Sequence, residues 1–193
     1  MRIKLQAILL FVFATGFSSL SAQEIAVKTN LFYAGLMQTP NIGTEWKISL
    51  KLTLDLWGAY NPFPLGKNGY GSTNKKMKHW IIRPELRYWL CEGFNGHFFG
   101  GHVFYGQYNI SNIHFLGTGN YRKQGNAVGV GISYGYQWIL SPHWSMEGAI
   151  GIGYARLHYN KYPCKECGKR ISTENRNYLG PTCAAISFIY LLK

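Results

Sequence analysis

Alternation of large apolar residues between positions 128 and 154 is the feature that most limits how this chain can fold. From Val128 to Leu140 every second residue is large and apolar, and the residues between them are mostly glycine, serine or glutamine. The short break Ser141-Pro142-His143 is followed by a second alternating run from Trp144 to Tyr154. A period of two over this length indicates β-strands, and the short break makes the two runs a hairpin.

The composition of the two faces of this hairpin indicates which side points inward. On a soluble sheet the second face would meet water and carry Lys, Glu and Thr. Three glycines, a serine and a glutamine suit the crowded interior of a small barrel better. The large face has aromatic residues near both ends, as a lipid-facing band with interfacial girdles has. We therefore interpret this stretch as a hairpin of an outer-membrane barrel.

The N-terminus has the pattern of a secretory signal peptide. Two basic residues precede the apolar run Ala7–Phe17, and small residues follow it. The run is too short to span a bilayer, which argues against a retained membrane anchor. We expect a signal peptide over residues 1–22, with cleavage after Ser21 or Ala22, and a single barrel domain over residues 23–193.

Eight strands are expected in all, joined alternately by short turns and long loops. The expected strands are about Ile25–Tyr33, Ile42–Ile48, Leu52–Tyr60, Trp80–Tyr88, His97–Tyr108, Val128–Leu140, Trp144–Tyr154 and Thr182–Leu192. The expected long loops are Asn61–Lys78, Asn109–Gln124 and Leu157–Leu179. The pattern does not decide which way the side chains of the fifth strand face.

The predicted fold class is therefore all-β, an eight-stranded antiparallel up-and-down transmembrane β-barrel of outer-membrane type. An even strand count with short turns at one end and long loops at the other is typical of such barrels. The rival is a soluble lipocalin-like barrel with its apolar face inside. The glycine-rich polar face and the aromatic residues at the strand ends argue against this rival.

The inward positions carry a balanced set of charges. Its predicted members are Lys28, Glu45, Lys47, Asp55, Arg83, Glu85, Arg87 and Glu147. A charge that is buried alone costs several kcal/mol, so interior charges need partners. Eight strands leave an interior just wide enough for side chains. We expect a salt-bridged plug rather than a solute path, a proton path or a catalytic pair of carboxylates.

The chain has a formal net charge of +12, and the excess of cations falls in the three long loops. The candidate anion-binding residues are Lys75, Lys76, Lys78, Arg122, Lys123, Lys169 and Arg170. A basic rim of this kind suits the phosphates of lipopolysaccharide or another anionic polymer. The alternative is that these loops are only solvated. No nucleic-acid-binding module is visible, so nucleic acid is not an expected partner.

Cys164 and Cys167 form the sharpest local motif, Cys164-Lys165-Glu166-Cys167. In an exported protein the simplest interpretation is a small disulfide ring within the last long loop. A redox site would need a βαβ context, and a zinc site would need two more ligands. His97 and His102 have neither metal-binding spacing nor a clear carboxylate partner, so we expect them to pack. No catalytic, cofactor-binding or metal site is predicted, and the protein is not expected to be an enzyme.

Several stretches resemble a bacterial family of outer-membrane-barrel-like proteins of unknown function, often encoded near fimbrial components. They are Lys28-Thr29-Asn30-Leu31, Thr39-Pro40-Asn41-Ile42-Gly43, Arg83-Pro84-Glu85-Leu86-Arg87-Tyr88-Trp89, Phe94-Asn95-Gly96-His97, Tyr105-Gly106-Gln107-Tyr108-Asn109, Ser133-Tyr134-Gly135-Tyr136-Gln137-Trp138, the Cys pair and Gly180-Pro181-Thr182. The resemblance implies a barrel and carries no assigned activity.

We therefore expect a non-enzymatic barrel in the outer membrane of a Gram-negative bacterium. It would present basic surface loops that serve envelope integrity or interactions with surface proteins such as fimbriae. Its expected partners are outer-membrane lipid and lipopolysaccharide, and the sequence specifies no oligomeric state. The alternatives are a barrel-borne enzyme that modifies lipid A and a small pore.

Overall fold

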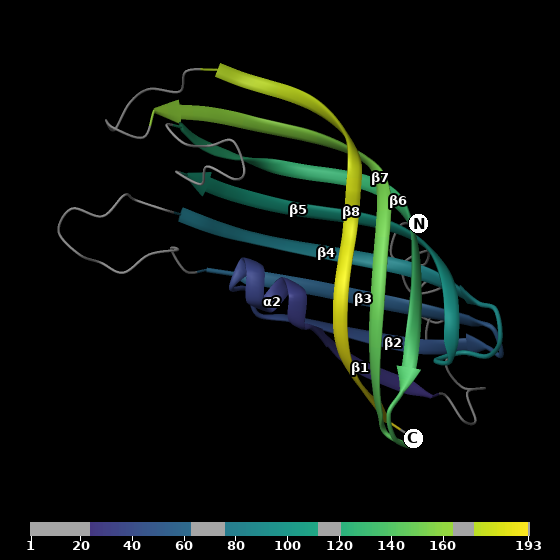
Figure 1. Ribbon diagram of the computed structural model, residues 1–193. Helices are drawn as coiled ribbons and strands as arrows, with labels where there is room; N and C mark the ends of the chain where they lie inside the picture. Colours follow the sequence, from purple (N-terminus) through teal and green to yellow (C-terminus); the bar gives the residue numbers. More distant parts are fainter. Residues whose placement is uncertain (1–23, 63–75, 112–120, 164–171, 193) are drawn as a thin grey trace, which may run out of the picture.

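The computed structural model describes residues 24–62, 76–111, 121–163 and 172–192. In this part of the chain the elements are β1 (Ile25–Asn30), α2 (Leu31–Met37), β2 (Asn41–Ser49), β3 (Leu52–Asn61), β4 (Lys76–Trp89), β5 (Gly96–Ser111), β6 (Tyr121–Ile139), β7 (Trp144–Pro163) and β8 (Ser172–Leu192) (Figure 1). Each strand pairs antiparallel with the next, and β8 pairs with β1, so the eight strands form a closed ring. The predicted all-β class and the number and order of the strands are confirmed.

Alternation of side chains gives the ring an interior and an outer face. On β3, Asp55 and Trp57 are buried inside, whereas Leu54 and Leu56 are exposed outside. The same alternation continues on β8, where the outward side chains are those of Ala184, Ile186, Phe188, Tyr190 and Leu192. Most of the large apolar residues of the strands therefore face outward, as the sequence predicts, while Trp57, Trp89, Phe98 and Ile189 are buried inside.

The structure also decides the facing of β5. Phe98 and His102 are buried inside, while Phe99 and Val103 are exposed on the outer face. The small inward residues of β6 make room for these side chains. A Cβ atom at Gly131 would lie 2.6 Å from His102 Nε2, closer than real side-chain atoms pack. The inward glycines of the alternating run therefore serve the packing of a narrow interior.

The two ends of the ring differ. The short connections β2–β3, β4–β5 and β6–β7 lie at the end where the first residue of β1, Ile25, pairs with Leu192 of β8. We call this the short-turn end. The opposite end, where the three longer connections leave and re-enter the strands, is called the long-loop end (Figure 1).

The strands reach further toward the long-loop end than the sequence predicts. β7 continues to Pro163 and β8 begins at Ser172, so most of the predicted loop Leu157–Leu179 is strand. Likewise β6 begins at Tyr121, inside the predicted loop Asn109–Gln124. Backbone pairing does not depend on apolar side chains, and the outward residues here are polar. The alternation of hydrophobicity therefore ends before the strands do.

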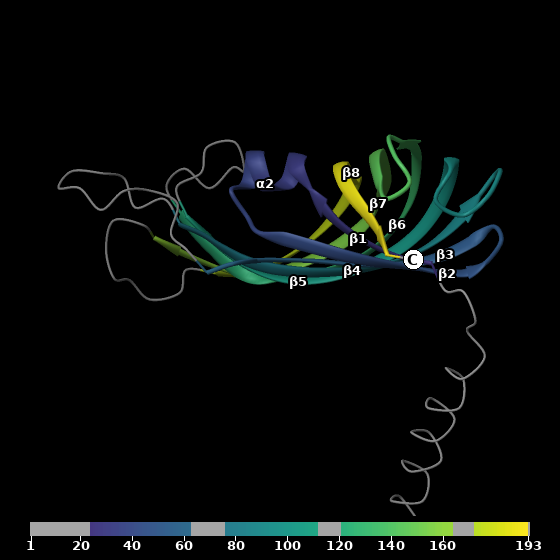
Figure 2. The same cartoon turned by 90° about the horizontal axis from the view of Figure 1, so that it is seen from below.

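The first strand is shorter than predicted because residues 31–37 form a helix. Asn30 caps this helix by accepting a hydrogen bond of 3.1 Å from the Tyr33 N–H. β1 pairs with β8 only as far as Asn30 and Ser187, and α2 packs against β8 beyond that point (Figure 2). Leu31 and Tyr33 thus belong to a helix rather than to the outer face of a strand. Within the described ranges, no helix has the length and hydropathy needed to cross a membrane.

Candidate functional site

Three buried carboxylates lie side by side across three neighbouring strands in the interior. The register places Glu45 of β2 opposite Asp55 of β3, and Asp55 opposite Glu85 of β4. All three side chains are essentially inaccessible to solvent. Like charges directly opposite one another are destabilising. This row therefore requires cations beside it.

Arg87 of β4 contacts every member of that row. Its Nη1 lies 3.0 Å from Glu45 Oε2, its Nε 2.8 Å from Glu85 Oε1, and its Nη2 3.3 Å from Asp55 Oδ2. The same guanidinium reaches β7, where Nη1 lies 2.6 Å from Glu147 Oε2. One buried cation thus joins carboxylates from β2, β3, β4 and β7.

Lys28 of β1 supplies a second buried cation. Its Nζ lies 2.7 Å from Glu45 Oε2 and 3.0 Å from Asp55 Oδ1. The Thr53 hydroxyl donates a further hydrogen bond of 2.5 Å to Glu45 Oε1. Six of the eight charges that the sequence places inside therefore meet in one group. We call this group the interior charge cluster: Lys28, Glu45, Asp55, Glu85, Arg87 and Glu147.

The other two predicted members are placed differently. Arg83 is buried, but its Nε lies 3.8 Å from Glu85 Oε2 and makes no hydrogen bond. Its guanidinium instead packs over the Trp57 ring, 5.0 Å from the centroid. Lys47 lies at the short-turn end, where its Nζ is 3.2 Å from Glu24 and 3.3 Å from Glu92. Lys47 therefore does not join the cluster, because the acidic residues beside the turns are within its reach.

The two histidines of β5 lie on opposite faces. His97 is on the outer face, where its Nδ1 lies 2.7 Å from the Tyr134 hydroxyl. His102 is buried, with Nε2 2.9 Å from Thr182 Oγ1 and Nδ1 3.7 Å from Glu85 Oε2. Each histidine also packs against a neighbouring ring, His97 against Tyr134 and His102 against Phe104.

The cysteines of the described ranges are unpaired. Cys91 is exposed and Cys183 is buried. Cys164 and Cys167, for which we predict a disulfide, lie outside the described residues. Within the described part of the chain, no group of three or more His, Cys, Asp or Glu side chains is arranged to hold a metal ion.

The outer face carries a continuous apolar surface around its middle. Ile150 is 70% exposed and Ile132 is 66% exposed, although both lie in the centres of long strands. We call this surface the outer apolar band: Leu54, Leu56, Ile82, Leu86, Val103, Val128, Val130, Ile132, Ile150, Ile152 and Ile186. Contiguous exposed apolar surfaces of this extent mark interaction with another apolar phase or protein.

Aromatic residues border the outer apolar band on both sides. On the short-turn side they are Tyr88, Phe99, Tyr134, Trp138, Trp144 and Tyr190. On the long-loop side they are Tyr60, Trp80, Tyr105 and Tyr154. Along β7 the borders are Trp144 and Tyr154. This separation matches the 9–11 residues or so that a tilted transmembrane strand requires.

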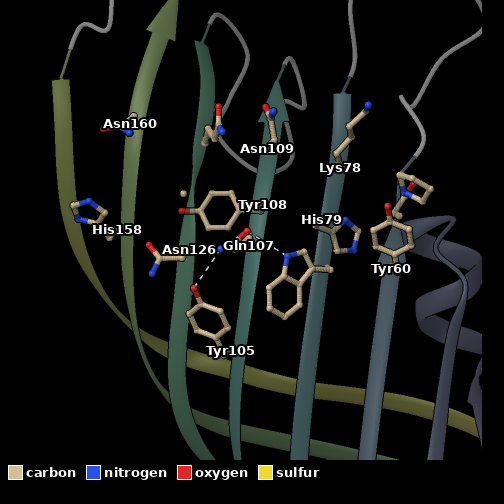
Figure 3. Close-up of a pocket in the computed structure, with 15 residues that line it drawn as sticks. Tyr60, Lys78, His79, Tyr105, Gln107, Tyr108, Asn109, Asn126, His158 and Asn160 are labelled. Carbon is tan, nitrogen blue, oxygen red and sulfur yellow. Dashed lines mark hydrogen bonds between the residues drawn. The ribbon is translucent and has the colours of Figure 1, made fainter.

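Beyond the band, toward the long-loop end, the outer face becomes polar. The register aligns two rows of outward side chains across β4, β5, β6 and β7. The lower row is Trp80, Gln107, Asn126 and His158, and the upper row is Lys78, Asn109, Gln124 and Asn160. Together they line a cleft of about 550 Å³ (Figure 3). We call it the outer cleft.

The outer cleft was not predicted from the sequence. Trp80 was expected to face outward, but the other residues of its two rows fall in the fifth strand or within or beside the expected loops, so no facing was assigned to them. The signal was present, because Gln107 and Asn109, Gln124 and Asn126, and His158 and Asn160 keep the period of two. A strand whose outward residues are polar and whose inward residues are mixed shows no alternation of hydrophobicity.

The candidate anion-binding residues divide between strands and undescribed segments. Lys76 and Lys78 lie on β4, and Arg122 and Lys123 on β6, rather than in loops. Lys78 is exposed, whereas the Lys123 ammonium lies 5.4 Å from the centroid of the Tyr159 ring. The remaining candidates, which lie outside the described residues, are Lys75, Lys169 and Arg170.

The Glu174 carboxylate at the long-loop end accepts hydrogen bonds from two neighbouring hydroxyl groups. The hydroxyls of Tyr159 and Ser172 donate hydrogen bonds of 2.8 and 3.0 Å to Glu174. These bonds hold the pKa of the Glu174 carboxyl below its usual range. Glu174 is therefore ionised throughout the neutral range and offsets part of the basic charge at this end.

The fold and these surfaces define a class: an all-β protein with eight antiparallel strands in a closed ring and a charged interior. The chain belongs to the family described as Protein of unknown function (DUF3575), whose family model matches residues 7–192. The expected membership in a family of unknown function is thus confirmed over nearly the whole chain. No curated protein and no solved structure matches the chain.

Proposed function

We propose that this protein is a non-enzymatic transmembrane β-barrel of the outer membrane of a Gram-negative bacterium. Its long-loop end faces the outside of the cell and presents basic groups to lipopolysaccharide. It serves envelope integrity or the attachment of surface proteins such as fimbriae. The observation that carries the proposal is the outer apolar band between two aromatic borders, around a charged interior.

The distribution of polarity supports a lipid environment over an aqueous one. In water, the outward side chains of Ile132, Ile150 and Ile152 would be exposed while Glu45 and Arg87 are buried. This is the reverse of the usual pattern in soluble proteins. In a bilayer, the same arrangement places apolar groups against lipid and the members of the interior charge cluster beside charges of opposite sign. Where all eight strands pair in a closed ring, no strand edge has unpaired backbone groups. A lipid environment requires this, because it offers no water to hydrogen-bond them.

The interior charge cluster supports a structural barrel over a pore. Its salt bridges cross the ring, because Lys28 on β1 and Arg87 on β4 both contact Glu45 on β2, and Arg87 also reaches Glu147 on β7. Eight-stranded barrels have interiors that side chains can fill. A solute that passed through the interior would have to separate these buried ion pairs, and breaking them costs several kcal/mol.

The position of the cations supports lipopolysaccharide as a partner. Lys78 is exposed beyond the long-loop aromatic border, at the level where phosphates of an outer leaflet would lie, and Lys76 is two residues further along β4. A cation near an anionic lipid surface contributes about 1 kcal/mol, and this attraction weakens with salt. We therefore expect Lys76→Gln/Lys78→Gln, which removes about 2 kcal/mol of attraction, to weaken binding to lipopolysaccharide about thirtyfold at low salt.

The experiment begins with membrane fractionation of cells that produce the full chain. The protein should be recovered with the outer membrane and should run faster on gels unheated than boiled. Lys51→Gln, an exposed lysine at the short-turn end, is the matched control and should bind lipopolysaccharide like the wild type. Recovery mainly as a soluble periplasmic protein contradicts the barrel proposal. Equal binding by wild type and double variant at all salt concentrations contradicts the lipopolysaccharide proposal.

One observation favours the alternative of a lipid A-modifying enzyme. Thr182, His102 and Glu85 are arranged in the order of a nucleophile, a base and an orienting carboxylate. The distance from His102 Nδ1 to Glu85 Oε2, 3.7 Å, is too long for a hydrogen bond. The structural proposal therefore expects Thr182→Val to leave the lipid A of the producing cell unchanged. A difference in its acyl chains would favour the enzyme.

A further inference from the structure

The outer cleft has the dimensions of a ligand site. Its volume of about 550 Å³ lies within the range of about 300–1,000 Å³ that is usual for small-molecule pockets. Each of its two rows crosses four strands and therefore extends about 14 Å, and the rows lie about 7 Å apart along the strands. An elongated ligand of several linked rings fits this shape better than a single small ion.

The amide groups of the upper row are oriented by Arg122. Arg122 Nε donates a hydrogen bond of 2.8 Å to Asn109 Oδ1, and Nη2 donates one of 3.1 Å to Gln124 Oε1. An arginine has donors only, so both amides must turn their oxygens toward it. Their NH₂ groups are left without a hydrogen-bond partner in the described part of the chain. Two fixed donors are therefore available to a ligand.

The lower row combines an amide with aromatic rings. Gln107 Oε1 accepts a hydrogen bond of 3.3 Å from Trp80 Nε1, and Gln107 Nε2 donates one of 3.4 Å to the Tyr105 hydroxyl (Figure 3). The Trp80 and Tyr105 rings meet edge to face at 5.5 Å. Asn126, next in the row, makes no hydrogen bond within the described ranges. Its amide can both donate to and accept from a ligand.

This combination of groups selects a class of ligand. Neutral amides suit hydroxyl groups, which donate and accept at once, and aromatic rings suit the C–H faces of sugar rings. Lys78, at the margin of the upper row, adds a single exposed cation for a phosphate or carboxylate substituent. A purely anionic ligand would call for more cations, and a purely apolar one for fewer amides.

We propose that the outer cleft binds a saccharide, namely the sugar headgroup of an outer-leaflet glycolipid. This inference rests on the proposed function, because the cleft lies on the outer face directly beyond the aromatic border of the apolar band. A glycolipid whose acyl chains lie against that band carries its sugars at the level of Gln107 and Asn126. The protein thereby recognises sugars in addition to phosphates.

The test uses purified full-length protein in detergent micelles and isothermal calorimetry. The probes are complete lipopolysaccharide, lipid A without core sugars, and the free core oligosaccharide. Asn126→Leu removes the central amide without disturbing a hydrogen bond of the described structure. The loss of about one or two hydrogen bonds to the ligand should weaken oligosaccharide binding about tenfold. Binding to lipid A, which keeps two sugar rings beside its acyl chains but is also held through those chains, should weaken by a smaller factor.

Asn177→Leu is the matched control. Asn177 is an exposed outward residue of β8 that does not line the cleft, so this variant should bind every probe like the wild type. Gln107→Leu is a second cleft variant for use if Asn126→Leu lacks heat-modifiable mobility. Tighter binding of complete lipopolysaccharide than of free oligosaccharide identifies the membrane glycolipid as the source, and equal binding identifies a soluble glycan.

Two outcomes would overturn the saccharide site. One is the absence of oligosaccharide binding by the wild type, and the other is equal binding by the wild type and Asn126→Leu. Neither outcome depends on cellular location, since the binding is measured in detergent. Failure of the proposed function, by contrast, is recognised from fractionation, so the two failures are distinguishable.

Discussion

Replacing Arg87 by glutamine removes the cation that joins four carboxylates in the interior. Glu85 and Glu147 would lose their closest cation, and Lys28 alone would remain to balance Glu45 and Asp55. Breaking one buried ion pair by removing a partner costs about 3–5 kcal/mol. Because Arg87 serves several carboxylates, we expect Arg87→Gln to lower the free energy of unfolding by at least about 4 kcal/mol.

Arg83→Gln is the matched control, because it removes an arginine from the same strand and the same face. Arg83 makes no hydrogen bond to a carboxylate in the described structure and approaches Glu85 only to 3.8 Å. Its main contact is with the Trp57 ring, a cation–π contact that contributes about 0.5–2 kcal/mol. The expected loss is therefore about 1 kcal/mol.

The assay is urea unfolding of the folded protein in detergent micelles, followed by tryptophan fluorescence. Trp57 and Trp89 are buried in the interior and should report on its exposure. In the double variant Arg87→Gln/Glu147→Gln, neutralising Glu147 should recover part of the stability lost in Arg87→Gln. A loss below 1 kcal/mol for Arg87→Gln, or equal losses for the two arginine variants, would refute the assignment of the interior charge cluster.

Four further outcomes are expected, three from local geometry and one, the disulfide, from the sequence motif alone. Gly131→Val should abolish the heat-modifiable form, since even its Cβ would collide with His102 and Thr182, whereas Gly101→Ala, with open space around it, should not. Mass spectrometry of unreduced peptides should find Cys164 joined to Cys167, and free thiols at these positions would contradict the predicted disulfide. A polar thiol reagent should modify the exposed Cys91 in the folded protein but the buried Cys183 only after unfolding. Asn30→Ala should lower the free energy of unfolding by about 2 kcal/mol, because it removes the α2 cap and the hydrogen bond from Asn30 Nδ2 to the Ala184 carbonyl, and no change in urea titration would contradict both roles.

Much of the fold follows from local patterns in the sequence. Alternation correctly predicted that Asp55 and Arg87 face inward, because a strand turns successive side chains to opposite faces. Helix α2 was missed for a different reason. Residues 31–37 are apolar enough to continue a strand, and only the cap at Asn30 and the tertiary packing against β8 distinguish the helix.

For the interior charges, the sequence predicts which face of the strand a side chain is on but not which partner it contacts. Facing alone places Lys47 and Arg83 inside, but it gives no distance along the barrel axis. The structure separates them, since Lys47 lies near the turns and Arg83 beyond the reach of a second carboxylate. Pairing of Arg87 with Glu147 depends on two strands far apart in the chain. Such contacts follow from ring closure, which no local pattern encodes.

The outer cleft depends on register across four strands. The residues Gln107, Asn126 and His158 become neighbours only through the pairing of β5 with β6 and of β6 with β7. A shift of two residues in either register would leave every side chain on the same face, but these residues would no longer be neighbours. The sequence therefore indicates that these residues point outward but not that they meet.

Accessibility of a spin label to oxygen and to a polar nickel complex tests the central claim, that the outer apolar band contacts lipid. The label is placed at Ile150→Cys, in the centre of the band, or at Gln124→Cys, beyond its border, in protein whose native cysteines are replaced by serine. In bilayer vesicles, we expect the label at 150 to be accessible to oxygen and shielded from nickel, and the label at 124 to be accessible to nickel. Equal exposure of both labels to nickel would contradict it.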